Sequence, residues 1–331
     1  MMKFTKILRG LSIFIIITVI ALALYLNRGL SYEIVPAKFN CLALEDGYFA
    51  PFDSLPNQIY GIGLSYAGHI NETASEFVPD IDPPVFKKAI TSITQDGAKV
   101  KLPSHDDLVN AVEKIEPSIR QQINEVINPL PALLDYEVEL GFVLLEDIDK
   151  KALNEEGYIP KIGFFIANDL SARSIVILGE GQINRYDYWG IAKSFPGFTP
   201  VSQKVWIPNE FKANAIPCIT LKCQLNGEIR QNQMTNDLIY TPLQMLQVIH
   251  RKYPDTPLKK GDWVLTGTPG GVIMSTPRWL VRLANMVGMN RFKKLNHKTR
   301  EDDIAKFLKR GDTVVIDGEG LGSVTVEFVW K

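Results

Sequence analysis

Apolar residues along most of the chain fall in short alternating or continuous runs, a pattern typical of β-strands. The clearest run covers residues 134–145, where β-branched and aromatic side chains occur without an interrupting proline. A helix is expected at residues 241–252, with Pro242 in its first turn. Further strands are expected at residues 59–64, 83–88, 162–167, 219–225, 263–266, 313–317 and 323–328. The pattern predicts an α+β fold in which β-sheet predominates.

A first helical segment interrupts this pattern at about residues 104–130. Apolar residues recur there at helical spacing, and Ser104 with Asp107 resembles a capping box. Pro117 should divide the segment into two helices, because proline breaks a helix interior. We expect an inserted helical pair packed on the β-rich domain.

A second helical segment is expected at about residues 273–303. Trp279 and Leu283 lie on one face of its first helix, and Arg282 lies on another. No acidic residue occurs between Gly271 and Arg300. A basic amphipathic helix of this kind suits a membrane surface, but packing on its own domain is the favoured interpretation.

The N-terminus carries an uncharged apolar run at residues 11–26, which approaches the length of a membrane-spanning helix. Three basic residues precede it and no small-residue cleavage pattern follows it, so an uncleaved anchor is favoured over a signal peptide. We expect a single-pass anchor at residues 1–28 and a juxtamembrane segment at residues 29–58. The charge bias places the N-terminus in the cytoplasm and the rest on the far side of the membrane.

Composition excludes some classes of protein. The 36 basic and 37 acidic residues give a net charge of −1, so no nucleic-acid partner is expected. The odd count of three cysteines argues against a disulfide framework, and Cys218 and Cys223 should lie on opposite faces of a strand. Four histidines argue against a histidine-based zinc site.

Glu137 and Glu139 lie two positions apart in the predicted strand 134–145, so their side chains share a face, roughly 6–7 Å apart. Neighbouring carboxylates repel each other unless a cation lies between them. Mg²⁺ or Mn²⁺ suits this pair, because both prefer oxygen ligands and leave positions open for water. Asp169, after the strand 162–167, could supply a third carboxylate. Two plainer alternatives stay open: surface glutamates on a solvated strand, and an aspartate that caps a helix.

Five short motifs follow one another between residues 135 and 272. They are Asp135-Tyr136-Glu137-x-Glu139-Leu140, Asn168-Asp169-x-x-Ala172-Arg173, Lys193-Ser194-Phe195, Asn226-Gly227-Glu228-x-Arg230-Gln231 and Thr266-Gly267-Thr268-Pro269-x-Gly271-Val272. In this order they resemble the catalytic domain of the fumarylacetoacetate hydrolase family, over roughly residues 59–328. The resemblance implies a mixed-sheet catalytic domain of the rolled β-sandwich type at residues 59–331, with the two helical insertions. It also implies a homodimer and a Mg²⁺ or Mn²⁺ ion held by Glu137, Glu139 and Asp169.

The resemblance further assigns roles to individual side chains. His69 and Glu72 resemble the family's dyad, in which the carboxylate orients the imidazole and the imidazole takes a proton from the attacking water. Lys193 matches a lysine that contacts charged substrate oxygens, and Arg173 is expected to pair with Asp169 or a neighbouring carboxylate. Substrate-binding roles fall on Lys88, Arg230, Gln231 and Thr268. The plainer alternatives are a loop histidine beside an N-capping asparagine, a solvated lysine and a structural turn.

The activity that the resemblance implies is hydrolysis of a carbon–carbon bond in acylpyruvate-like or other 1,3-dicarbonyl acids, through an enolate stabilised by the metal ion. A decarboxylase, hydratase or isomerase of 2-oxo acids could use the same ion. A membrane-tethered binding protein without turnover is a third possibility, and the retained general base argues against it. Ser174 and Ile273 depart from the family's usual residues, which leaves the shape of the pocket and the substrate open.

Overall fold

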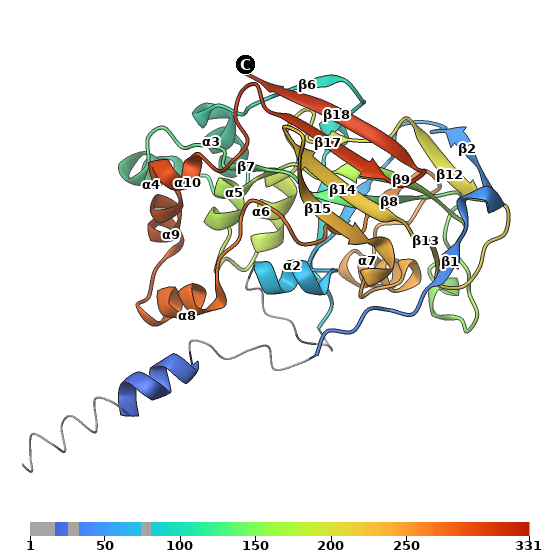
Figure 1. The fold of residues 1–331 in the computed structure, drawn as a ribbon, viewed down its shortest axis with the longest axis horizontal. Helices are drawn as coiled ribbons and strands as arrows, with labels where there is room; N and C mark the ends of the chain where they lie inside the picture. Colours follow the sequence, from blue (N-terminus) through green and yellow to red (C-terminus); the bar gives the residue numbers. More distant parts are fainter. Residues whose placement is uncertain (1–16, 26–32, 74–77, 79–80, 331) are drawn as a thin grey trace, which may run out of the picture.

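The computed structural model describes residues 17–25, 33–73, 78 and 81–330, and it shows an α+β fold with two large β-sheets (Figure 1). Within the larger sheet β3 and β16 run parallel, and the other neighbouring strands run antiparallel. In spatial order its seven strands are β2 (Gly47–Pro51), β12 (Lys204–Pro208), β9 (Ile162–Asn168), β8 (Val138–Leu144), β16 (Trp263–Leu265), β3 (Ile59–Ile62) and β4 (Val85–Lys88).

The second large sheet has five strands, in the spatial order β15 (Glu228–Met234), β14 (Thr220–Leu225), β17 (Thr313–Gly318), β18 (Gly322–Val329) and β6 (Ala98–Lys101). Asn226 and Gly227 form the predicted hairpin turn between β14 and β15, and both have the positive φ that this turn requires. Three short pairs join β1 (Asn40–Leu42) to β13 (Ala215–Pro217), β7 (Leu134–Asp135) to β10 (Ser171–Ala172), and β5 (Ile93–Thr94) to β11 (Thr199–Pro200).

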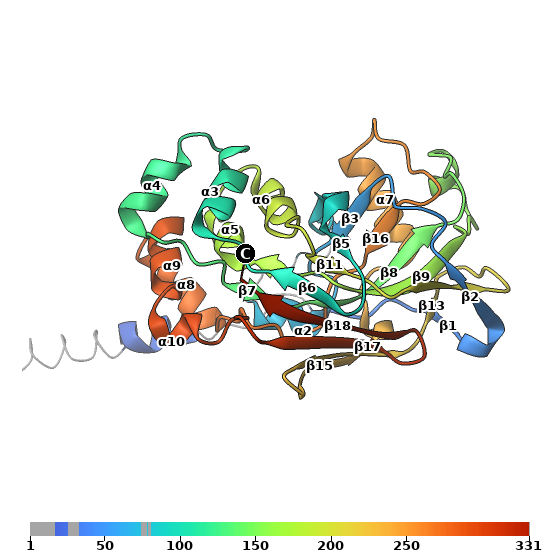
Figure 2. The same cartoon turned by 90° about the horizontal axis from the view of Figure 1, so that it is seen from above.

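The two large sheets pack against each other. β14 and β17 contact β8, and β17 and β18 contact β9, so the five-stranded sheet lies over the middle of the larger one (Figure 2). Every residue of β8 and β9 is buried. Because both faces of these strands are covered, their sequences are nearly continuous apolar runs. The two glutamates near the start of β8 therefore lie in the interior and not on a solvated edge. The finer description of the fold as a rolled β-sandwich stays a prediction.

Helices gather mainly at one end of the molecule, where both insertions lie beside α5 and α6 (Figures 1 and 2). The capping box of Ser104 and Asp107 forms as predicted, and Pro117 lies between the two helices of the first insertion. Between residues 33 and 330 the described α-helices are α2 (Ala67–Glu72), α3 (His105–Glu113), α4 (Ile119–Val126), α5 (Arg173–Leu178), α6 (Arg185–Ala192), α7 (Pro242–Lys252), α8 (Arg278–Met286), α9 (Arg291–Lys298) and α10 (Glu301–Ile304).

The strand predicted at residues 134–145 is broken at Tyr136 and Glu137, which separate β7 from β8. Side chains supply the hydrogen bonds that a neighbouring strand would otherwise provide at the break. The backbone N–H of Glu137 donates to Asn168 Oδ1 at 3.0 Å, and that of Val138 donates to Gln231 Oε1 at 3.0 Å. The pattern of apolar residues could not show this break, because it contains no glycine or proline at the position.

The expected single-pass membrane anchor is wrong. Residues 17–25 are helical, and within the described residues no helix is both long and apolar enough to cross a membrane. The rest of the proposed anchor lies outside the described residues. Residues 40–51, expected in a juxtamembrane segment, instead contribute β1 and β2 to the sheets.

The expectation of no disulfide framework is also wrong. Cys41 in β1 and Cys218 after β13 form a disulfide that spans 177 positions of the chain. Cys223 is free and buried, so the predicted absence of a bridge between Cys218 and Cys223 is confirmed. Sequence spacing did not reveal the bridge, because the parallel pairing of β1 with β13 is what brings its two cysteines together.

Candidate active site

The three carboxylates singled out in the sequence lie together. Glu137 precedes β8, Glu139 lies within it and Asp169 follows β9. β8 and β9 are antiparallel, with Val138 opposite Asn168, so the end of one strand adjoins the start of the other. One carboxylate oxygen from each side chain lies within 4.8 Å of the others, and all three residues are buried. We call Glu137, Glu139 and Asp169 the acidic cluster. Asp169 does not cap a helix, because α5 begins only at Arg173.

Buried cations neutralise two members of the acidic cluster. The Lys193 ammonium contacts Glu137 and lies 2.6 Å from Asp169 Oδ2. Lys88 pairs with Asp169, and Arg173 pairs with Glu137. Burial raises the pKa of Glu137, but the charges of Arg173 and Lys193 outweigh it and lower that pKa to about 2.

Glu139 is the member without a cationic partner. Its Oε2 accepts a hydrogen bond of 2.8 Å from the backbone N–H of Gly267, and among the described residues no lysine or arginine forms an ion pair with it. Burial raises the pKa of Glu139 well above its usual range, and the nearby Asp169 carboxylate raises it further. A divalent cation would supply the missing positive charge, so the cluster fits an ion that prefers oxygen ligands.

The buried side chain of Asp135 holds neighbouring parts of the site in place, a role that sequence reasoning missed. Its carboxylate pairs with Arg173 at 2.8 Å and accepts hydrogen bonds from the backbone N–H groups of Ile273 and Met274 at 2.9 and 3.0 Å. Arg173 therefore pairs with Asp135 and Glu137, which are neighbouring carboxylates. The first residue of the Asp135-Tyr136-Glu137 motif was the available signal for this role.

His69 and Glu72 share the short helix α2 but make separate contacts. His69 is buried at the pocket wall, and its Nδ1 has no hydrogen-bond partner in the described structure. Burial lowers the pKa of His69 to about 4; the charge of Glu137 opposes this, while those of Arg173 and Lys193 add to it. Glu72 Oε2 accepts a hydrogen bond of 2.7 Å from the backbone N–H of Gly271. The pKa of Glu72 is raised, because burial outweighs the opposing effect of this hydrogen bond.

The four residues expected to bind substrate have different surroundings in the structure. Thr268 lines the pocket, donates to the carbonyl of Val138 at 3.0 Å and accepts from Gln231 Nε2 at 2.8 Å. Lys88 reaches the acidic cluster through Asp169. Gln231 holds the start of β8 through Val138, while Arg230 is exposed and pairs with Glu228 on the hairpin.

The acidic cluster lines a pocket, which we call the site pocket. His69, Arg173, Lys193, Gly267 and Thr268 also line it. The lining further includes apolar side chains, which we call the apolar wall and which sequence reasoning missed because its members come from separate elements: Ile62, Leu64, Phe86, Val176 and Trp189. The site pocket thus combines a buried group of charged side chains with a hydrocarbon lining.

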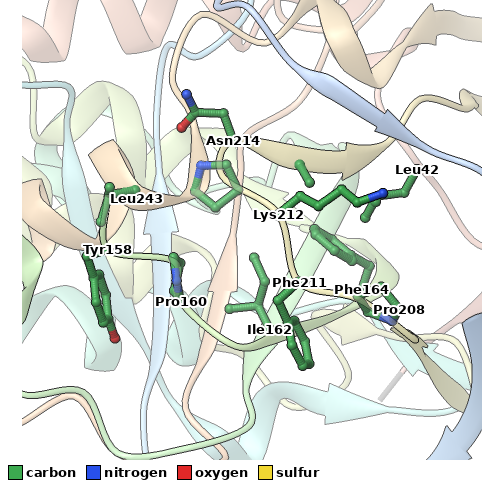
Figure 3. A pocket seen from close by; sticks show the side chains of 12 residues that line it. Leu42, Tyr158, Pro160, Ile162, Phe164, Pro208, Phe211, Lys212, Asn214 and Leu243 are labelled. Carbon is green, nitrogen blue, oxygen red and sulfur yellow. The ribbon is translucent and has the colours of Figure 1, made fainter. Parts of the chain in front are cut away.

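A second pocket lies elsewhere, between residues of the 208–215 segment and the start of α7 (Figure 3). Its lining is mainly apolar, with Phe211, Tyr158 and Leu243 among the side chains. Among the described residues that line it there is no carboxylate or histidine. The chemistry of the molecule is therefore expected in the site pocket.

The fold and the site define an α+β enzyme domain with a buried acidic cluster that could bind a divalent metal. Residues 58–329 match the family described as "Fumarylacetoacetate (FAA) hydrolase C-terminal". The chain belongs to this family, whose members include hydrolases, isomerases and tautomerases.

Several named proteins are similar to this chain. The fumarylacetoacetate hydrolase domain-containing protein 2 homolog of Dictyostelium discoideum is 26% identical over 277 residues, which cover 81% of this chain and 70% of that protein. The mitochondrial oxaloacetate tautomerase FMP41 of Saccharomyces cerevisiae is 28% identical over 226 residues, covering 65% of this chain and 81% of that protein.

Two solved structures share the fold. The 5-carboxymethyl-2-hydroxymuconate delta-isomerase from Mycobacterium smegmatis has a TM-score of 0.51 at 23% identity, covering 84% of this chain and 80% of that one. The fumarylacetoacetate hydrolase from Exiguobacterium antarcticum has a TM-score of 0.51 at 21% identity, covering 85% of this chain and 78% of that one. These likenesses concern the fold alone.

Proposed function

We propose that this family member is a divalent-cation-dependent hydrolase that cleaves a carbon–carbon bond in acylpyruvate-like or other 1,3-dicarbonyl acids. The observation that carries the proposal is the placement of His69 and Lys193 beside the acidic cluster in one pocket. Glu137, Glu139 and Asp169 would hold Mg²⁺ or Mn²⁺. Such an ion supplies Lewis-acid polarisation of a substrate carbonyl.

The chain's own side chains would bind the substrate and move the proton. The Lys193 ammonium, which is shared between Glu137 and Asp169, would contact a substrate oxygen. The His69 imidazole would accept a proton from a water molecule whose oxygen bonds to the acyl carbon. The carbon–carbon bond then breaks, and the carbon of the departing pyruvate takes up a proton. The products are pyruvate and a carboxylic acid.

Isomerisation, tautomerisation or decarboxylation of a 2-oxo acid is the second candidate. One observation favours it: Glu72 bonds to Gly271, and the described structure shows no carboxylate on His69 Nδ1 that would strengthen it as a base for water activation. A tautomerase needs only proton transfer on the substrate and no attacking water. The similarity to the yeast oxaloacetate tautomerase agrees with this candidate.

A substrate panel separates the two candidates. The full chain is incubated with acetylpyruvate, fumarylpyruvate or oxaloacetate in the presence of Mg²⁺, Mn²⁺ or EDTA. We expect EDTA-sensitive formation of pyruvate and a carboxylic acid from at least one acylpyruvate, and its loss in Glu139→Gln. Turnover of oxaloacetate alone, or tautomer conversion without chain cleavage, would favour the second candidate. The homodimer and the catalytic domain boundaries at residues 59–331 stay predictions.

A further inference from the structure

We infer that the preferred substrate carries a single carboxylate and an apolar tail, and that Leu64 and Trp189 select this tail. The inference rests on the proposed function, because it assumes that the 2-oxo acid end of the substrate lies at the acidic cluster. It concerns the opposite end, which must lie along the apolar wall.

The apolar wall adjoins the charged residues of the site pocket. Phe86 is buried, and the Lys193 ammonium lies 5.5 Å from the centre of its ring. Trp189 stands edge-on to Phe86, with 6.0 Å between the ring centres, and is partly exposed. A substrate held by Lys193 would therefore extend along aromatic rings before it reached solvent.

Two backbone features maintain this wall. A Cβ on Gly63 would lie 2.6 Å from a ring atom of Trp189, so the absence of a side chain at Gly63 lets the indole approach the strand end. Leu64 has a φ of 56°, a left-handed conformation that is uncommon for a residue other than glycine. Such conformations occur preferentially at functional sites. Here the conformation belongs to a leucine that lines the site pocket.

Among the described residues that line the site pocket, no lysine or arginine remains unpaired for a second carboxylate. The two cationic residues of its lining, Arg173 and Lys193, are each already paired with two carboxylates. A bound divalent cation would be offset by the acidic cluster and by the first carboxylate of the substrate. A distal carboxylate would thus lose its hydration without gaining an ion pair.

A matched pair of ligands tests this inference. The probes are 2-oxohexanoate and 2-oxohexanedioate, which have the same chain length and differ only in the second carboxylate. Oxalate and pyruvate serve as references without a tail. Affinities are measured by calorimetry on the full chain with Mn²⁺. Each buried methylene contributes roughly fourfold in affinity, so we expect 2-oxohexanoate to bind at least about tenfold more tightly than pyruvate or 2-oxohexanedioate.

Substitutions at the wall provide a second readout. Leu64→Lys places an ammonium on a side chain of similar reach, and Leu64→Met is its neutral control with the same backbone demand. We expect Leu64→Lys to bind 2-oxohexanedioate at least about tenfold more tightly than Leu64→Met does, with oxalate affinity the same in both. Trp189→Ala should lower the affinity for 2-oxohexanoate and leave the affinity for oxalate unchanged. This variant keeps the test valid should the Leu64 variants not fold.

The outcomes distinguish failure of the inference from failure of the proposed function. Tight oxalate binding together with 2-oxohexanedioate binding equal to or tighter than 2-oxohexanoate overturns the inference and leaves the proposed function standing. Absence of Mn²⁺-dependent oxalate binding overturns the proposed function, and the inference falls with it.

Discussion

Glu72 accepts a hydrogen bond from the backbone N–H of Gly271, 199 positions further along the chain. The bond ties the helix that carries His69 to the glycine-rich turn that follows β16. Gly271 has a φ of 103°, and a Cβ there would lie 2.1 Å from the carbonyl oxygen of Arg230, so only glycine fits. This contact therefore helps to hold α2, and with it His69, beside the site pocket.

Replacement of Glu72 should separate its structural role from a catalytic one. Glu72→Ala leaves the amide of Gly271 without its acceptor, and we expect a loss of about 1–3 kcal/mol in the free energy of unfolding. Glu72→Gln keeps an acceptor oxygen and should retain most of both stability and kcat. Chemical denaturation and steady-state kinetics measure the two effects. An equal loss of kcat in the Gln and Ala variants would show that Glu72 acts through the imidazole.

Replacement of Glu139 should remove metal binding. Glu139→Gln removes the carboxylate of the acidic cluster that has no cationic partner among the described residues, so Mn²⁺ affinity should fall by more than the roughly 10–100-fold that loss of a residue supporting a metal ligand costs. Circular dichroism should show the fold unchanged. Glu228→Gln, on the exposed hairpin, is the matched control and should bind Mn²⁺ as the native chain does. Unchanged affinity in Glu139→Gln would exclude the proposed metal site.

Replacement of His69 should affect hydrolysis more than metal binding. Loss of a general base lowers kcat by roughly 10²–10⁴-fold, and we expect this for acylpyruvate hydrolysis by His69→Ala. Decarboxylation of oxaloacetate should suffer less, because it needs no attacking water. His297→Ala, on the exposed side of α9, is the control. Equal losses for both reactions would contradict the water-activating role.

The contact between the two insertions should make stability depend on pH. Glu116 pairs with Arg291 at 2.5 Å, and hydrogen bonding to this guanidinium lowers the pKa of Glu116. Because the folded-state pKa is depressed, the unfolded chain binds more protons as pH falls, so this stabilisation is present above the usual pKa of glutamate and is lost below it.

Denaturation at pH 6 and pH 3.5 measures this effect. The native chain should lose more stability over this interval than Glu116→Gln does, by a modest margin because the pair is partly exposed. Glu113→Gln removes a more exposed pair with Arg120 and should change the pH dependence less. Identical pH profiles for the native chain and Glu116→Gln would contradict the contribution of this ion pair.

The disulfide should contribute to stability. Cys41 and Cys218 close a loop of 177 positions, and removal of such a bridge typically costs about 2–5 kcal/mol. We expect Cys41→Ser to lower the free energy of unfolding by about this amount, and reductant to lower that of the native chain equally. Reductant should leave Cys41→Ser unaffected. A native chain indifferent to reductant would show that the bridge contributes little.

The sequence alone predicted the local structure well where the signal is local. The Asn226-Gly227 hairpin, the capping box of Ser104 and α7 with Pro242 in its first turn all formed, because turn and capping preferences are properties of a few adjacent residues. The motif order likewise indicated the family. The sequence also predicted that Glu137, Glu139 and Asp169 would meet.

Only the tertiary structure decided what surrounds those carboxylates. The pairing of Arg173 with Asp135, the bond from Gly271 to Glu72 and the bridge of Cys41 to Cys218 each join residues that are distant in the chain. The apolar wall of Leu64, Phe86 and Trp189 is assembled in the same way. Apolar periodicity reports which side of an element is buried, but it carries no information about which distant element covers that side. The mixture of charged and apolar side chains in the site pocket, and hence the substrate that it suits, therefore depends on contacts between distant parts of the chain.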